Sequence, residues 1–253
     1  MKHFAIKTAK EAGEILLKYF HKALKVKQKG AKGNIVTNAD LAAEKYIINA
    51  IRKKYPTHSI LSEEMGEKKI GESEYKWIID PLDGTRNFAS DIPFFSVLIA
   101  LTKKEKIILG VIYDPIHDEL FYAEKGKGAY LNNKKIRVSR EKSLRGAVVK
   151  LGWVWSRKRF KKVGRYYARF SKYTSWIRRY GSVSSLAYLA CGRLDVAIHI
   201  GAYPWDYAAP SIICKEAGAK VTDLKGNPYD ISKREILAAN PRLHKFVLKN
   251  IIK

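Results

Sequence analysis

The chain has 253 residues, of which 46% are hydrophobic and 29% are charged, and it carries a formal net charge of +25. This composition excludes a disordered chain, and the length suffices for one large domain or two halves. No apolar run is long enough to cross a bilayer, and residues 1–20 follow a helical rather than a signal-peptide pattern, so we expect a cytoplasmic protein without membrane contact.

The first half of the chain, residues 1–145, is predicted to be mainly antiparallel sheet with two helices. Apolar residues recur at helical spacing near the N-terminus and again after Asp40, and later segments show strand patterns. The predicted helices cover 2–24 and 41–55, and the predicted strands cover 58–62, 77–79, 94–102, 107–113, 119–123 and 128–131. The polar stretches 27–34 and 65–75 are predicted loops.

The second half, residues 146–253, changes to an alternation of strands and helices. The predicted strands cover 148–154, 176–180, 195–200 and 220–222, and the predicted helices cover 158–172, 183–191 and 207–217. This organisation predicts an α+β or α/β protein with two sheet layers and with helices between and outside them. We expect the two halves to share one cleft.

The positive charge is concentrated in residues 142–194, which contain no Asp or Glu. Aromatic side chains are interleaved with the Lys and Arg residues of this segment. Such a field attracts anions, whether phosphorylated metabolites, RNA or a negatively charged surface. The segment is equally compatible with a solvated basic face above ordinary core aromatics.

Residues 77–88, WIIDPLDGTRNF, are the most informative stretch of the chain. An apolar strand run stops at Asp80-Pro81, and a second acid, Asp83, follows. Burying carboxylates is costly unless a cation pairs with them, and Mg²⁺ prefers carboxylate and carbonyl oxygens. Gly84 and Thr85 could open a turn whose N–H groups face an anion. Taken alone, the same residues are also compatible with a surface turn.

Further polar residues stand at the ends of other predicted strands or the starts of helices. They are Glu63, Glu64, Asp206, Asp40 and Lys29. Each has an ordinary alternative, because Asp is a common helix cap, a Glu pair suits a solvated turn, and a lysine suits any surface. The chain has twice as many bases as acids, so the recurrence of acids at strand ends favours a site.

The chain resembles the inositol monophosphatase family of Mg²⁺-dependent sugar-phosphate phosphatases, and the resemblance runs almost end to end. The matching segments are 63–64, 80–88, 110–115, 126–129, 179–182, 192–195, 205–209 and 216–218. The resemblance implies a layered α-β-α-β-α sandwich and a homodimer. The family includes archaeal enzymes with both inositol monophosphatase and fructose-1,6-bisphosphatase activity, and the chain is a candidate for that type.

The resemblance also implies a site for two or three Mg²⁺ ions, for which Mn²⁺ can substitute. The implied metal ligands are Glu63, Glu64, Asp80, the backbone carbonyl of Leu82, Asp83 and Asp206. Two such ions would activate water on one side of a phosphate and hold the leaving oxygen on the other.

The remaining roles implied by the resemblance concern substrate and water. Asp83, Gly84 and Thr85 would lie at the phosphate, and Thr85 with Asp40 behind it would orient the attacking water, next to the catalytic Glu63. Lys29 would lie near the phosphate or a metal-bound water. The residues implied at the sugar are Gly181, Ser182 and Val183.

One position departs from the family and bears on the substrate. Seven residues before Asp206, where many relatives have a glutamate that contacts substrate hydroxyls, this chain has His199. Inositol 1-phosphate is the first candidate substrate, and fructose 1,6-bisphosphate is another if Arg178 and Arg179, or residues 157–162, bind a second phosphate. A 3′-phosphoadenosine 5′-phosphate phosphatase is an alternative. An RNA-associated regulatory protein using residues 142–194 is an alternative of a different class.

Overall fold

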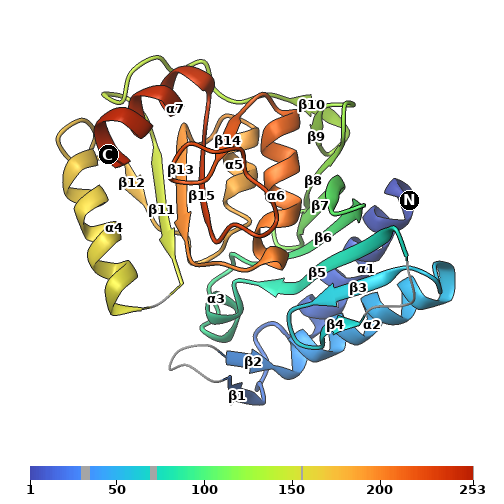
Figure 1. Ribbon diagram of the computed structural model, residues 1–253. Coiled ribbons are helices and arrows are strands. Elements are labelled where there is room, and N and C mark those ends of the chain that lie inside the picture. The colour runs from blue at the N-terminus through green and yellow to red at the C-terminus, as the bar shows by residue number, and fades with distance from the viewer. Residues whose placement is uncertain (30–34, 69–72, 155, 253) are drawn as a thin grey trace.

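A computed structural model describes residues 1–29, 35–68, 73–154 and 156–252 of the chain. Its helices and strands form five layers, with two sheets separated by one layer of helices and covered outside by two more (Figure 1). The predicted layered α-β-α-β-α sandwich is therefore confirmed.

The larger sheet has eight strands in the order β10-β9-β8-β7-β6-β5-β3-β4. Neighbouring strands are antiparallel except for β3 and β5, which run parallel. The strands are β3 (Ser59–Ser62), β4 (Gly66–Lys68), β5 (Tyr75–Asp83), β6 (Ser96–Lys103), β7 (Lys106–Asp114), β8 (Glu119–Glu124), β9 (Ala129–Leu131) and β10 (Lys134–Ile136).

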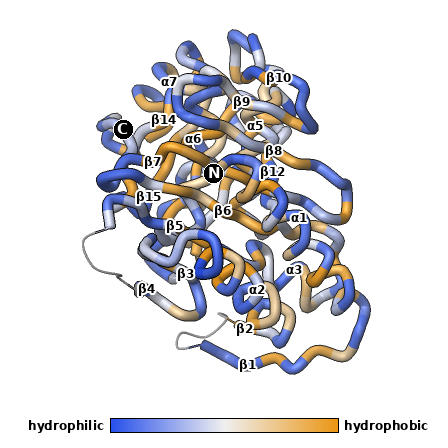
Figure 2. The backbone as a smooth tube through the Cα atoms, turned by 90° about the vertical axis from the view of Figure 1, so that its right-hand side faces the viewer, coloured by the Kyte–Doolittle hydropathy of each residue, from blue (hydrophilic) through white to orange (hydrophobic). Residues whose placement is uncertain are grey.

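Two amphipathic helices cover the outer face of this sheet. Helix α1 (Lys2–Tyr19) and helix α2 (Asn38–Lys54) pack on each other and on β5, β6 and β7. Their buried positions follow helical spacing, so one face of each helix contributes to an apolar core with the sheet. Figure 2 shows the apolar stretches gathered on the strands in the middle of the molecule.

The second sheet has five strands in the order β12-β11-β13-β15-β14. The strands are β11 (Val149–Trp153), β12 (Ile177–Arg178), β13 (Val196–Ile200), β14 (Lys220–Thr222) and β15 (Glu235–Ala239). Helices α5 (Leu186–Ala190) and α6 (Pro204–Glu216) lie between the two sheets. The outer face is covered by α4 (Arg157–Phe170), α7 (Pro241–Val247) and a π-helical turn (Leu248–Ile252). Both faces of this sheet are thus buried.

The first predicted helix and the loop after it were partly wrong. Helix α1 ends at Tyr19 rather than at residue 24, because Phe20 takes an extended backbone and packs against Phe88 and Phe95. The loop predicted at 27–34 begins inside a strand, since β1 (Val26–Gln28) pairs with β2 (Ile35–Thr37). Residues 30–34 of that prediction lie outside the described residues.

Several other boundaries differ from the prediction. The segment 65–75, predicted as a loop, contributes β4 and the start of β5, and its residues 69–72 lie outside the described part. Helix α6 begins at Pro204, so Asp206 lies in its first turn rather than before it. The strand predicted at 176–180 is limited to β12.

The elements after residue 222 were missed altogether. Asn240 caps α7 by accepting a hydrogen bond from the Leu243 N–H at 3.0 Å, and Pro241 opens the helix. Both are known signals of a helix start.

Among the described residues, no helix is long and apolar enough to cross a membrane. The short helix α3 (Thr85–Ala89) follows the end of β5.

Candidate active site

Three carboxylates meet where β5 ends and α6 begins. Asp80, Asp83 and Asp206 offer oxygen atoms that all lie within 4.8 Å of one another. Residues three apart in a regular strand point to opposite faces. Here the pairing of β5 with β6 shifts register between Asp80 and Asp83, so the strand is bulged. The bulge turns both acids to the same side.

Asp80 and Asp83 are buried, and Asp206 is partly buried. Burial raises the pKa of Asp80 well above its ordinary value, and the neighbouring Glu63 and Asp83 raise it further. Burial, followed by Glu63, likewise raises the pKa of Asp206. Clustered carboxylates of this kind fit a hard divalent cation such as Mg²⁺, which prefers oxygen ligands and would neutralise them.

The two glutamates after β3 form an ion-paired group with Lys29. The Lys29 ammonium lies 3.0 Å from Glu63 Oε1 and also contacts Glu64. Burial raises the pKa of Glu64 to about 7 and also raises that of Glu63. Burial disfavours the charged form of Lys29, but the two carboxylates outweigh this effect and raise its pKa. The structure therefore brings Lys29, Glu63 and Glu64 together.

A buried residue that the sequence analysis missed holds this turn. Glu44 Oε1 accepts hydrogen bonds from the N–H groups of Glu64 at 3.0 Å and Met65 at 3.1 Å, and from the Ser62 hydroxyl. Glu44 follows Asp40 by four residues on α2, so the two acids share one helix face. That spacing was the signal that could have found it.

Asp40 links the start of α2 to Thr85. Its Oδ2 accepts the backbone N–H of Thr37 at 2.8 Å and the Thr37 hydroxyl at 2.6 Å, forming a capping box. Its Oδ1 lies 3.1 Å from the Thr85 hydroxyl, which is also 3.0 Å from the Leu82 carbonyl oxygen. Burial raises the pKa of Asp40. The residue is thus both a helix cap and a partner of Thr85.

Gly84 makes the turn between β5 and α3. Its φ of 93° lies in the left-handed region, and a Cβ there would stand 3.0 Å from the Phe94 carbonyl oxygen. Only glycine fits this position without strain. The turn places Thr85 directly after the acids.

Asp83 ties the two halves of the chain together. Its carboxylate accepts hydrogen bonds from the N–H of Val183 at 3.0 Å, the N–H of Ser184 at 2.6 Å and the Ser182 hydroxyl at 2.5 Å. Gly181 precedes these donors with a φ of 75°. The predicted sugar-binding segment 181–183 therefore lies directly against a predicted metal ligand.

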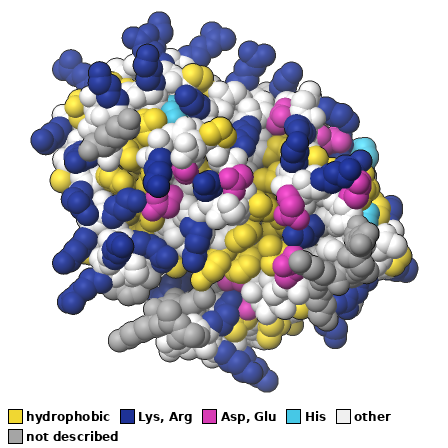
Figure 3. Space-filling model, viewed as in Figure 1, with side chains coloured by type: hydrophobic (Ala, Val, Ile, Leu, Met, Phe, Trp, Pro, Cys, Tyr) yellow, Lys and Arg dark blue, Asp and Glu magenta, His cyan; other side chains and the backbone are white. Residues whose placement is uncertain are grey.

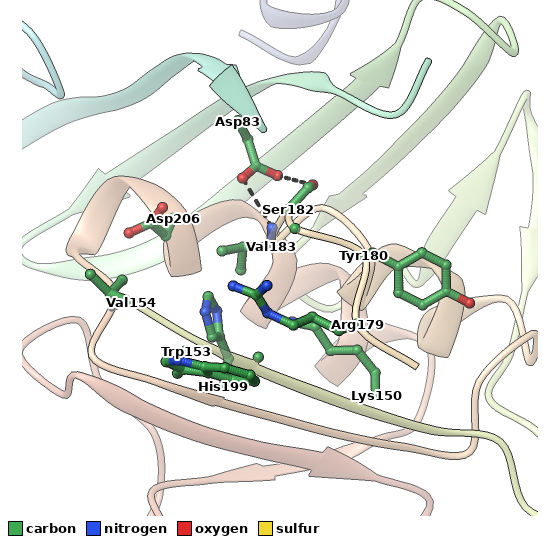
Figure 4. A pocket seen from close by; sticks show the side chains of 12 residues that line it. Asp83, Lys150, Trp153, Val154, Arg179, Tyr180, Ser182, Val183, His199 and Asp206 are labelled. Atoms are coloured by element: carbon green, nitrogen blue, oxygen red, sulfur yellow. Dashed lines mark hydrogen bonds between the residues drawn. The ribbon is translucent and has the colours of Figure 1, made fainter. Parts of the chain in front are cut away.

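A cavity of about 160 Å³ opens beside these acids. The residues lining it are Asp83, Lys150, Gly152, Trp153, Val154, Arg179, Tyr180, Gly181, Ser182, Val183, His199 and Asp206. Figure 4 shows the Arg179 side chain reaching into the middle, between the acids on one side and Trp153 and His199 on the other. On the face drawn in Figure 3, Asp and Glu stand around a central patch of hydrophobic side chains, and Lys and Arg lie mostly at the periphery.

The wall formed by β11 and β13 carries two unexpected buried groups. Lys150 and His199 are 1% and 7% exposed, and Lys150 Nζ and His199 Nδ1 have no hydrogen-bond partner among the described residues. Burial lowers the pKa of Lys150 to about 8 and lowers that of His199 well below its ordinary value. Arg178, for which a phosphate contact was predicted, lies over the Trp176 ring and is not among the residues that line the cavity.

Comparison with known proteins identifies the family of this site. The sequence profile of the inositol monophosphatase family matches residues 1–252. The chain belongs to the inositol monophosphatase family. The "Nus factor SuhB" of Escherichia coli K12 is 38% identical over 259 residues, covering 99% of this chain and 95% of that protein. The Haemophilus influenzae protein of the same name is 40% identical over 261 residues, with the same coverage.

Solved structures of the inositol monophosphatase family have the same fold. The extragenic suppressor protein suhB of Bartonella henselae superposes with a TM-score of 0.94 at 36% identity, covering 98% of this chain and 97% of that one. A Thermotoga maritima IMPase superposes with a TM-score of 0.91 at 34% identity, covering 98% and 95%. The family is one of metal-dependent phosphatases, and the acid cluster of this chain suits that chemistry.

Proposed function

We propose that the chain is a Mg²⁺-dependent phosphomonoesterase that hydrolyses a small phosphorylated polyol or sugar. Inositol 1-phosphate and fructose 1,6-bisphosphate are the candidate substrates. The observation that carries the proposal is the meeting of Asp80, Asp83 and Asp206 within 4.8 Å, next to the Thr85–Asp40 pair.

Metal binding would fall to residues from three segments. In this proposal the metal ligands are Glu63, Glu64, Asp80, the Leu82 carbonyl, Asp83 and Asp206, which would hold two or three ions. Bound Mg²⁺ supplies charge neutralisation on the phosphoryl oxygens and lowers the pKa of a bound water. The Lys29 ammonium, already paired with Glu63 and Glu64, adds positive charge near the incoming phosphate.

Thr85 and Asp40 would orient the attacking water. The Thr85 hydroxyl has one proton and two acceptors within reach, Asp40 Oδ1 and the Leu82 carbonyl oxygen. Since that proton is directed at one of them, the hydroxyl oxygen is free to accept a hydrogen bond from water. Asp40 thus acts as a positioning residue through Thr85. The N–H groups of Gly84 and Thr85 would face the phosphate.

The rest of the substrate would lie in the cavity. Gly181, Ser182 and Val183 form one side of it, and His199 stands opposite. Burial keeps the imidazole of His199 neutral, so a ring nitrogen can either donate a hydrogen bond to a substrate hydroxyl group or accept one from it. An ionised glutamate at this position would only accept hydrogen bonds. It would therefore favour a substrate with a different arrangement of hydroxyl groups.

A substrate panel tests this proposal. Phosphate release from inositol 1-phosphate, fructose 1,6-bisphosphate and 3′-phosphoadenosine 5′-phosphate is measured with Mg²⁺, with Mn²⁺ and with a chelator. We expect hydrolysis of at least one of the first two, lost on chelation. Hydrolysis of none, with either metal, would refute the phosphatase assignment.

The division into halves at 145/146, the homodimer and the cytoplasmic location stay predictions.

A second candidate function is association with RNA. The relatives named Nus factor SuhB motivate it, as does one observation on this chain. Helix α4 presents basic side chains, and Phe160, Tyr167 and Trp176 are 51%, 55% and 54% exposed on the same segment. Exposed aromatics among cations suit stacked single-stranded bases. Binding of labelled single-stranded RNA, titrated with salt, should show a steep salt dependence. No retention near about 150 mM salt would exclude this role.

A further inference from the structure

The cavity wall formed by the second sheet contains hydrogen-bond donors that nothing in the described structure satisfies. Lys150 Nζ, Trp153 Nε1 and His199 Nδ1 are buried and have no hydrogen-bond partner among the described residues. All three side chains line the same cavity. Lysine and indole nitrogens are donors only, so this wall lacks acceptors.

The position of Lys150 in the strand explains why its charge cannot reach solvent. Val149 and Leu151 face the outer core with α4, whereas Lys150 and Gly152 face the inner side of the sheet. Gly152 pairs with His199 in the parallel β11–β13 ladder. A Cβ on Gly152 would stand 2.8 Å from the His199 ring and 3.1 Å from Lys150 Nζ. The glycine therefore leaves the space in which both side chains meet.

Arg179 adds a second cation from the opposite side. Its Cζ lies 4.3 Å from the centre of the Trp153 ring, which holds the guanidinium by cation–π attraction. The lining thus contains two cations, Lys150 and Arg179, and two carboxylates, Asp83 and Asp206. A divalent ion held by the two carboxylates would neutralise them. Arg179 would then lack a carboxylate partner in the cavity, and Lys150 would lose the two carboxylates that support its charged form.

In the proposed mechanism the cavity would lie on the leaving-group side of the site. Its lining includes Asp83 and Asp206 but neither Glu63 nor the Gly84–Thr85 turn at which the phosphate is expected. A buried ammonium without a partner is costly to a folded chain. An acidic group of the ligand would remove that cost by accepting from the unsatisfied donors.

We propose that Lys150, with Arg179 and Trp153, forms an anion-binding subsite for a second acidic group on the alcohol part of the substrate. The ligand class is a small phosphomonoester that carries a further carboxylate or phosphate. This proposal rests on the proposed phosphatase function for the identity of the first phosphate. It adds a residue, Lys150, and a substrate property that an inositol monophosphate lacks.

Non-hydrolysable phosphonates test the subsite without turnover. Calorimetry with Mg²⁺ compares propylphosphonate with 3-phosphonopropionate and with 1,3-propanediphosphonate, which add a carboxylate and a phosphonate respectively. We expect the wild-type chain to bind at least one of the two acidic ligands about tenfold to a hundredfold more tightly, the range for hydrogen bonds to charged groups. Tighter binding of 3-phosphonopropionate would identify the second acidic group as a carboxylate, and tighter binding of 1,3-propanediphosphonate would identify it as a phosphate.

Lys150→Met assigns the preference to Lys150. This variant keeps an unbranched side chain. We expect it to reduce the ratio of the dissociation constant of propylphosphonate to that of the better acidic phosphonate by about tenfold or more. Lys245→Met, which removes a charge from the exposed face of α7, is the matched control and should leave the ratio unchanged. The Tm of Lys150→Met in Mg²⁺ should equal or exceed that of the wild type, because an unpaired buried charge is removed.

The outcomes separate this proposal from the proposed function. Equal binding of acidic and neutral phosphonates by the wild type would overturn the subsite. So would a Lys150→Met variant that has a lower Tm and loses affinity for both ligands equally, because Lys150 would then be structural. A chain that keeps the Lys150-dependent preference but hydrolyses no phosphomonoester would refute the phosphatase function and leave the anion subsite standing.

Discussion

Asp83 and Lys150 are buried charged groups in the same cavity, but only one of them has partners within the described chain. The Asp83 carboxylate accepts hydrogen bonds from Val183, Ser184 and Ser182, so its orientation is fixed before any ligand arrives. The Lys150 ammonium has none. The difference separates a group that the fold holds rigidly for chemistry from one whose partner must come from outside.

The largest expected effect compares Asp83→Asn with Asp206→Asn. Both should reduce kcat/KM by about 1,000-fold or more, because metal ions supply several kcal/mol of transition-state stabilisation and 1.36 kcal/mol is tenfold. Asn at 83 has a single acceptor oxygen and would direct its NH₂ at a backbone N–H, which should cost about 1–3 kcal/mol of unfolding free energy. Asn at 206 can still accept from the Tyr203 N–H.

Steady-state kinetics and thermal unfolding without metal measure both effects. Only Asp83→Asn should unfold at a lower temperature, since only Asp83 is braced by three donors. Near-normal activity of Asp206→Asn would contradict the metal assignment. Equal melting temperatures for the two variants would contradict the bracing of Asp83.

The next largest effect concerns Glu44, which has partners as Asp83 does but contacts no substrate in the proposed mechanism. Glu44→Ala removes the acceptor of the Glu64 and Met65 N–H groups and should lower kcat/KM by about tenfold to a hundredfold, as for residues that orient metal ligands. The Mg²⁺ concentration for half-maximal activity should rise in parallel. Glu44→Gln keeps an acceptor oxygen and should retain most of the activity. A Gln variant as poor as Ala would show that the charge matters instead.

His199→Glu would give Lys150 a partner within the chain. The difference between Asp83, which has partners, and Lys150, which has none, would then disappear. Both side chains flank Gly152, so the new carboxylate would lie next to the ammonium. We expect the preference for the more tightly bound acidic phosphonate over propylphosphonate to fall by about tenfold, the lower value for a hydrogen bond to a charged group. Calorimetry in Mg²⁺ measures it, with His199→Gln as the uncharged control. An unchanged preference in the Glu variant would place the acidic ligand away from Lys150.

The smallest effect is the pH dependence of stability in the metal-free chain. The pKa of Glu64 is raised from an ordinary 4.5 to about 7, and burial raises those of Asp80 and Asp206 as well. At these carboxyl groups the folded chain therefore binds more protons than the unfolded chain, whereas at His58, His199 and His244, whose pKa values burial lowers, it binds fewer. The contribution of the Glu64 carboxyl to the free energy of unfolding is fully present below pH 4.5 and should be lost as the pH rises towards 7.

Thermal unfolding in a chelator between pH 4.5 and 7.5 measures this slope. A loss of 1 kcal/mol corresponds to a decrease in Tm of about 2–4 °C for a chain of this size. Added Mg²⁺ should flatten the profile, because the carboxylates are then neutralised without protons. The slope of the wild type minus that of Glu64→Gln isolates the Glu64 carboxyl, and equal slopes for the two chains would contradict its raised pKa.

The acids of the site were predictable because they interrupt a strong local pattern. Asp80 and Asp83 end an apolar strand run, and Glu63 and Asp206 stand at similar boundaries. The layered fold followed from the change between an antiparallel and an alternating half. The bulge that brings Asp80 and Asp83 to one side was not predictable, since it depends on pairing with β6.

Lys150 illustrates what the sequence could not reveal. It lies within a segment of many basic residues, and its strand is correctly predicted. Strand alternation does not identify an inward position here, because both faces of the second sheet are buried. The partners of Asp83 were equally hidden, because they lie about a hundred residues further along the chain.

The bonds of Asp83 to residues 182–184 also bear on how the protein is made. They join positions 99 to 101 residues apart, and Asp206 follows later still. Contacts of such long sequence separation form late, because the entropy of closing the intervening loop opposes them. A nascent chain that has not yet emerged beyond Ser184 lacks the donors that brace this acid. Assembly of the centre therefore requires that the chain has been synthesised at least as far as Asp206.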